Sequence, residues 1–191
     1  MTADRPSLAI DDLDVMAPGA FAVAVAPLFE GARGFLGRLA MARPFGSVEA
    51  MFARAREIAQ AMPLDERLEL IDAHPRLGAP PASVSVLSLA EQGYGARTAS
   101  IEGGDEATAG AQEALRVADE LARLNDAYEA RFGFRYCVYV AGRSRAALLP
   151  GLATALEADR DAEIRRALDA VIDIAQARYA TLTAPPAEEP A

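Results

Sequence analysis

The sequence predicts an all-α protein, a single-domain helical bundle, and three observations support this prediction. Apolar residues recur with the helical spacing of three to four along most of the chain. Apolar residues also make up 52% of the 191 residues, which is enough for a packed core. Only Tyr136–Val140 (YCVYV) resembles a strand. Because a lone strand has no partner, we expect an extended segment or a buried helix start there.

The individual helices are predicted from apolar stripes and from residues that start or stop helices. Ser47 is a suitable N-cap for the first of them, and Gly133 is a stop signal after the third. Pro150 starts or kinks the fourth. The predicted ranges are Val48–Met62, Leu64–Ala73, Glu106–Phe132, Ser144–Glu157 and Ile164–Leu182.

The segments outside these helices predict the domain limits. Met1–Asp14 is mixed and acidic, and we expect a flexible arm. Residues 15–182 form one domain, with internal loops at Ala79–Leu87 and Thr98–Asp105. Thr183–Ala191 is rich in proline and acid, and we expect a disordered tail.

The composition excludes several kinds of chemistry. All 19 basic residues are arginine, so neither a lysine Schiff base nor a phosphate loop of the GxxxxGK type can form. His74 is the only histidine and Cys137 the only cysteine, too few for a closed zinc site or an intramolecular disulfide. We therefore expect no metal and no organic cofactor.

The net charge and the hydropathy of the chain indicate which partners and which cellular location to expect. The 28 acidic residues give a net charge of −9, which argues against nucleic acid as a partner. The longest apolar run, Ala20–Phe29, is too short to cross a bilayer and contains a proline. We expect a cytoplasmic protein with no membrane association.

His74 is the first candidate for chemistry, because any imidazole chemistry must use it. It directly precedes Pro75, which excludes the helical conformation for His74 and predicts that the helix stops there. A histidine at this point can act as an acid or a base. The alternative is a surface or capping histidine at a helix end.

Ser88, Glu91 and Gln92 form a second candidate. Ser-x-x-Glu is a capping box, in which Ser88 and Glu91 bond to each other's backbone N–H groups. In the functional interpretation, Glu91 and Gln92 open a helix whose N-terminus faces a pocket and binds an anion.

Arg178 and Cys137 are the remaining candidates. Arg178 continues an apolar stripe of the last helix, where an arginine is costly unless it meets an anion. It either binds a ligand or extends to solvent over its own aliphatic stem. Cys137 lies in an apolar run and is most simply a buried structural thiol.

Five motifs occur in order along residues 20–182: Arg43-Pro44-Phe45, His74-Pro75-Arg76-Leu77-Gly78, Ser88-x-x-Glu91-Gln92, Leu124-Asn125 with Tyr128 and Arg131-Phe132-Gly133-Phe134, and Arg178 in the last helix. Together they resemble the OHCU decarboxylase family, which acts on 2-oxo-4-hydroxy-4-carboxy-5-ureidoimidazoline. The sequence departs from the family pattern at Arg135, where many members have proline, and at Tyr136, where phenylalanine is usual.

The resemblance implies an all-α homodimer that decarboxylates this compound to (S)-allantoin in urate catabolism, without a cofactor. It implies that His74 is the catalytic acid or base and that Glu91 hydrogen-bonds in the same site. The residues it implies for substrate binding are Pro75, Ser88, Leu89, Ala90, Gln92, Tyr136, Cys137, Val138, Tyr139, Val140 and Arg178. Two alternatives remain: a helical interaction module without chemistry, or another lyase or hydrolase of a ureido compound on the same scaffold.

Overall fold

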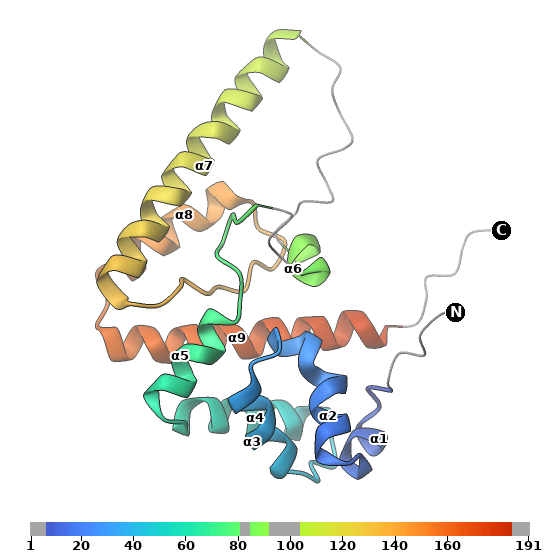
Figure 1. Cartoon of the computed structure of the whole chain (residues 1–191). Coiled ribbons are helices and arrows are strands. Elements are labelled where there is room, and N and C mark those ends of the chain that lie inside the picture. The colour runs from blue at the N-terminus through green and yellow to red at the C-terminus, as the bar shows by residue number, and fades with distance from the viewer. Residues whose placement is uncertain (1–6, 81–84, 92–103, 185–191) are drawn as a thin grey trace, which may run out of the picture. The chain divides into compact units, whose positions relative to one another are not determined.

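The computed structural model describes residues 7–80, 85–91 and 104–184, and the regular secondary structure of these residues is helical (Figure 1). These residues form α-helices and one 3₁₀-helix, and no strand occurs among them, so the all-α prediction is confirmed. The chain divides into two compact units: unit 1 comprises residues 1–73 and 168–191, and unit 2 comprises residues 74–167.

Unit 1 is built mainly from the N-terminal helices. Residues 10–14, which we expected in a flexible arm, instead belong to a helix, because Leu13 is fully buried in the core of the unit. The elements of unit 1 are α1 (Ile10–Val15), α2 (Pro18–Val25), η1 (Ala26–Phe29), α3 (Arg33–Met41), α4 (Val48–Ala61), α5 (Leu64–Asp72) and the part of α9 (Arg160–Thr183) from residue 168 onward.

The helix predictions for α4 and α5 are confirmed to within one residue at each end. Ser47 caps α4 as expected, since its Oγ accepts a hydrogen bond from the Ala50 N–H at 3.1 Å. The apolar stripe of α4 is buried, with Met51, Phe52 and Ala55 at its centre. The amphipathic pattern therefore defines which face of this helix enters the core.

The Arg43-Pro44-Phe45 motif has a structural role inside unit 1. The Arg43 guanidinium donates hydrogen bonds to the carbonyls of Ala40, Leu13 and Met16 at 2.7, 2.9 and 2.5 Å. Buried carbonyls beyond a helix end need such donors. The motif thereby connects the end of α3 to α1.

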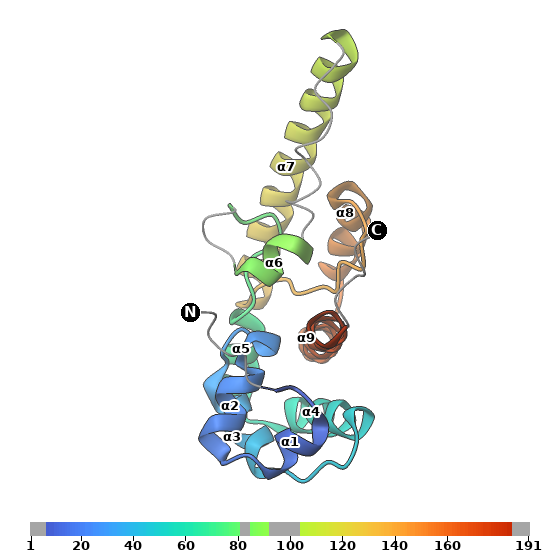
Figure 2. The same cartoon turned by 90° about the vertical axis from the view of Figure 1, so that its right-hand side faces the viewer.

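Unit 2 contains α6 (Val86–Glu91), α7 (Gly104–Phe132), α8 (Arg145–Ala155) and the first turns of α9. α7 and α8 pack side by side, and the N-terminal half of α7 extends beyond α8 in both views (Figures 1 and 2). α7 ends before Gly133, whose φ of +77° is the left-handed conformation expected of a helix stop. Pro150 lies inside α8 rather than at its start.

The connection between α7 and α8 settles the interpretation of the strand-like segment. Residues 135–140 have no regular secondary structure, so Tyr136–Val140 is neither a strand nor a helix start. Three predicted segments lie partly outside the described residues: the loops Ala79–Leu87 and Thr98–Asp105, and the tail Thr183–Ala191. Of these segments, residues 86–87 belong instead to α6, residues 104–105 to α7 and Thr183 to α9. None of the helices in the described part of the chain has the length and apolar character that crossing a bilayer requires.

Candidate active site

His74 opens a short loop in unit 2, directly after the end of α5. α5 ends at Asp72 and is capped by Ala73, so the helix stops where the His74-Pro75 pair predicted. The side chain of His74 is not on the surface, because the residue is only 4% exposed. The alternative of a surface histidine is therefore wrong, since this loop folds inward against other parts of unit 2.

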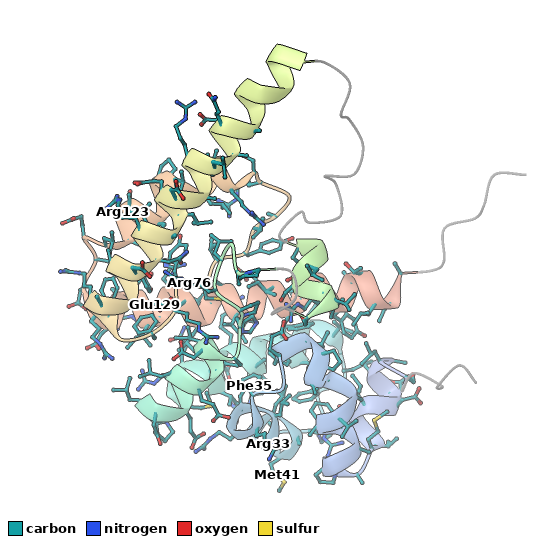
Figure 3. All side chains as sticks on the ribbon, turned by 45° about the horizontal axis from the view of Figure 1, so that its top comes forward. Arg33, Phe35, Met41, Arg76, Arg123 and Glu129 are labelled. Atoms are coloured by element: carbon teal, nitrogen blue, oxygen red, sulfur yellow. The ribbon has the colours of Figure 1, made fainter. Side chains whose placement is uncertain are left out.

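The His74 loop, residues 74–78, is held against α7 by polar contacts. Arg76 donates to Asp126 Oδ1 at 2.5 Å and to the Ala122 carbonyl at 3.0 Å, and its Nε lies 3.2 Å from Glu129 Oε1 (Figure 3). The buried amide of Asn125 donates to the Leu77 carbonyl at 3.0 Å. The His74 loop is thus bound along one face of α7.

Gly78 permits the close approach of this loop to α7. Its φ is +81°, and a Cβ built on it would lie 2.7 Å from Cδ2 of Leu121. A larger residue would force the Leu121 side chain to shift and would be strained at this φ. The backbone conformation and the close approach therefore both favour the glycine of the His74-Pro75-Arg76-Leu77-Gly78 motif.

Arg135 connects the His74 loop to the segment that follows α7. Its Nη1 donates a hydrogen bond to the backbone carbonyl of His74 at 3.2 Å. A proline, which many family members have at this position, has no side-chain donor to make this contact. The departure at Arg135 thus adds a direct contact with the backbone of the candidate catalytic residue.

α6 carries the second group of candidates, and here the structure corrects the sequence interpretation. Ser85, not Ser88, provides the capping oxygen, since Ser85 Oγ accepts from the Ser88 N–H at 3.2 Å. Ser88 lies inside the helix and is 2% exposed, while Glu91 is its last residue and half-buried. The capping box and the helix opened by Glu91 and Gln92 are therefore wrong, because α6 begins two residues before Ser88.

The remaining members of this group are placed only in part. Leu89 is half-buried on α6, and Ala90 belongs to the same helix. Gln92 lies outside the described residues. The pairing of Glu91 with His74 stays a prediction.

The segment Tyr136–Val140 combines buried side chains with an irregular backbone. Tyr136 and Cys137 are each 5% exposed, which agrees with the interpretation of Cys137 as a buried thiol. Val140 is also buried, Val138 is half-buried, and Tyr139 is exposed. Burial raises the pKa of the Tyr136 phenol, so it stays protonated at neutral pH.

Arg178 lies in unit 1 on α9, and its side chain is 1% exposed. The anion it meets is Glu30, whose Oε1 lies 2.8 Å from Arg178 Nη2. Nη1 donates to the carbonyls of Pro27 and Leu28 at 3.1 and 3.4 Å. The alternative of an arginine that extends to solvent is wrong, because Glu30 and η1 offset the cost of its burial.

Several residues that the sequence interpretation did not select support this part of unit 2. They are Glu163 and Arg166, together with Arg76, Asn125 and Arg135, which were named in the motifs or beside them without a role in the site. The available signal was a polar residue inside an apolar stripe, as with Asn125 between Leu124 and Tyr128. Among the described residues, no cluster of His, Cys, Asp or Glu could hold a metal ion.

Known proteins resemble the chain over nearly its full length. Uric acid degradation bifunctional protein PucL of Bacillus subtilis (strain 168) is 29% identical over 173 residues, which are 91% of this chain and 32% of that protein. The 2-oxo-4-hydroxy-4-carboxy-5-ureidoimidazoline decarboxylase of Haloferax volcanii is 27% identical over 183 residues, covering 91% of this chain and 95% of that protein. The chain spans about a third of the length of the two Bacillus relatives it matches.

Solved structures agree on the fold. An OHCU decarboxylase crystallised in the presence of (S)-allantoin has a TM-score of 0.60 and 23% identity, covering 82% of this chain and 94% of that chain. An (S)-allantoin synthase has a TM-score of 0.61 and 17% identity, covering 91% of this chain and 54% of that chain. The family model described as OHCU decarboxylase matches residues 14–180, both units included. The chain therefore belongs to the OHCU decarboxylase family.

Proposed function

We propose that this protein decarboxylates 2-oxo-4-hydroxy-4-carboxy-5-ureidoimidazoline to (S)-allantoin in urate catabolism, without a cofactor. The observation that carries the proposal is the placement of the only histidine. His74 is buried in a loop held against α7, in a chain of the OHCU decarboxylase family. A buried imidazole in such a loop suits proton transfer at a defined place.

The reaction needs one proton transfer to carbon and little else. The bond between C4 and the carboxylate breaks as CO₂ leaves, and its electron pair forms a double bond to the neighbouring ring carbon that bears the ureido group. The C=N electron pair moves onto the ring nitrogen, which takes up a proton. The C4 hydroxyl then becomes a carbonyl as it loses its proton, and the ring carbon that bears the ureido group gains one. In the product, one proton thus stands in place of the carboxylate that left as CO₂. A single acid on one face gives one enantiomer.

The roles of the other residues are part of the proposal. His74 exchanges the protons, and Glu91 orients it. Ser88, Gln92 and the backbone of Tyr136–Val140 hold the polar ring and the ureido group. This leaves the substrate carboxylate poorly solvated, which favours loss of CO₂. The family resemblance supports these roles, and it also supports substrate binding by Arg178.

Assembly and location belong to the same proposal. The family resemblance supports a homodimer, and the acidic, lysine-free composition supports a small-molecule substrate rather than nucleic acid. A single cysteine without an intramolecular partner suits the reducing cytoplasm.

The test generates the substrate from urate in the cuvette and adds the purified protein. We expect faster ultraviolet decay of the substrate, together with a circular dichroism signal of one allantoin enantiomer. The matched sample without protein decays slowly and gives both enantiomers. If the protein changes neither the decay nor the chirality, the proposed function is wrong.

A further inference from the structure

Tyr128, Glu163 and Arg166 form a polar cluster in unit 2 that contacts the segment Tyr136–Val140. The Tyr128 hydroxyl donates to Glu163 Oε1 at 2.7 Å. Arg166 Nε donates to the same oxygen at 2.8 Å, and Arg166 Nη2 lies 2.6 Å from it. Tyr128 is fully buried and Glu163 is 2% exposed, so α7 and α9 share this cluster inside the unit.

Arg166 extends from this cluster to the segment itself. Its Nη1 donates a hydrogen bond to the Cys137 carbonyl at 3.0 Å. Its guanidinium carbon also lies 4.8 Å from the ring centroid of Tyr136, within the range of a cation–π contact. Because residues 135–140 form no helix or sheet, their carbonyls find other donors: those of Tyr139 and Val140 accept from Arg143, and that of Cys137 accepts from Arg166.

The cluster is preorganised by charge and by aromatic packing. Burial and the neighbouring Glu163 carboxylate raise the pKa of Tyr128, so the phenol keeps its proton and remains a donor. The Tyr128 ring packs edge-on against Tyr136 and Phe134, at centroid distances of 5.2 and 5.6 Å. Glu163, held by two partners, in turn fixes the orientation of the planar Arg166 guanidinium.

We propose that Arg166, oriented by Glu163 and Tyr128, is a positioning residue that fixes the Cys137 carbonyl and thereby aims the backbone groups of Val138–Val140 at the ligand. This inference rests on the proposed function, in which that backbone holds the polar ring and the ureido group of the substrate. A ligand of this kind presents several amide-like donors and acceptors in a plane. It is bound well only by partners at fixed positions.

The chemistry of arginine explains why this residue type is needed. The guanidinium carries donors on separate nitrogens, and Arg166 uses them on Glu163 and on the Cys137 carbonyl at once. A lysine at this position keeps the positive charge but presents one nitrogen, which cannot make both contacts in the same geometry. Arg166→Lys therefore removes the positioning and keeps the charge.

The experiment measures KM and kcat of Arg166→Lys in the substrate-decay assay, with hydrogen exchange of the peptide that contains residues 136–140. Arg123→Lys is the matched control, because Arg123 pairs with Glu120 on an exposed face of α7 (Figure 3). We expect Arg166→Lys to raise KM about tenfold, equivalent to one hydrogen bond, with kcat changed less than KM. We also expect faster exchange in that peptide, and no change from Arg123→Lys.

Tyr128→Phe is the second variant, for the case that Arg166→Lys does not fold. It removes only the hydroxyl that orients Glu163, so we expect a smaller rise in KM with the same change in exchange. An unchanged KM in a folded variant of an active protein would overturn the positioning role. An inactive wild-type protein would instead overturn the proposed function, so the two failures are distinguishable.

Discussion

Each unit of this protein contains an arginine–glutamate pair that also contacts backbone carbonyls, and the two pairs differ in which backbone they contact. In unit 1, Arg178 meets Glu30 and the carbonyls of Pro27 and Leu28, at the end of the 3₁₀-helix η1. In unit 2, Arg166 meets Glu163 and the carbonyl of Cys137, in a segment without regular structure. The same chemical pair thus supports a helix end in one unit and an irregular segment in the other.

The two arginines differ in burial, so we expect their removal to have different effects on stability. The side chain of Arg178 is 1% exposed, whereas that of Arg166 is 36% exposed. When Arg166 is removed, Glu163 keeps the hydrogen bond from the Tyr128 hydroxyl, and water can enter the place of a side chain that was 36% exposed. When Arg178 is removed, the Glu30 carboxylate loses a cation from a place that is closed to water, and the desolvation penalty is larger. We therefore expect Arg178 to matter more for stability and Arg166 more for the geometry of the segment it contacts.

Replacing Arg178 with methionine has the largest expected effect on stability. Arg178→Met takes this cation from the Glu30 carboxylate, whose side chain is 13% exposed, at a cost of about 3–5 kcal/mol in the free energy of unfolding. Arg166→Met costs less, because Glu163 keeps the hydrogen bond from Tyr128. Urea unfolding of the two variants measures both values.

The control for this prediction adds Glu30→Gln to Arg178→Met. Removing the buried charge as well as its partner restores part of the lost stability. Equal losses in the Arg178 and Arg166 single variants, or no recovery in the double variant, would contradict the comparison of the two pairs.

Removing the Tyr128 hydroxyl has an intermediate effect that depends on pH. Tyr128→Phe takes one donor from Glu163, and a hydrogen bond to a charged group contributes about 1.5–3 kcal/mol. Because the pKa of Tyr128 is raised above its ordinary value of 10.0, this contribution is complete below pH 10 and is lost as pH rises further. Urea unfolding at several pH values measures it.

The direction in which the stability difference changes with pH tests whether the Tyr128 hydroxyl donates to Glu163. The stability difference between wild type and Tyr128→Phe stays constant at neutral pH and shrinks in alkaline solution. A difference that grows above pH 10 would mean that the Tyr128 hydroxyl does not donate to Glu163.

Gly78→Ala has the smallest expected effect of the three, at about 1–2 kcal/mol of destabilisation, because it adds a Cβ at φ +81° beside Leu121. Gly37→Ala on α3 is the matched control. Nothing lies within 4 Å of its added Cβ, and alanine favours a helix over glycine by about 1 kcal/mol. Thermal unfolding should show opposite signs for the two changes. The same sign in both would argue against a packed contact between the His74 loop and α7.

The helices α4, α5, α7, α8 and α9 could be predicted from the sequence because their apolar periods are strong. Ser47 marks the start of α4 and Gly133 the end of α7. α1, α2, α3 and α6 were not predicted. α1, for example, is a six-residue helix among acidic residues, which has no readable period and forms because the core buries Leu13. Local sequence does not encode a contact of that kind.

The motif residues of the candidate site could be predicted from the sequence, whereas the side chains that hold them in place could not. His74 could be selected because it is the only histidine, and Pro75 located it at a helix end. Glu163 and Arg166 looked like an ordinary surface pair three residues apart on a helix. Only the folding of α7 and of the segment after it against α9 shows that they contact Tyr128 and Cys137.

The central claim is that His74 transfers the proton, and the most direct measurement compares wild type with His74→Gln in the substrate-decay assay. Glutamine keeps hydrogen-bonding groups at the site but cannot exchange a proton near neutral pH. We predict that kcat/KM falls about 10²–10⁴-fold and that the allantoin formed loses its single handedness, in a variant that unfolds in urea like the wild type. Full activity with one enantiomer in His74→Gln would contradict the account.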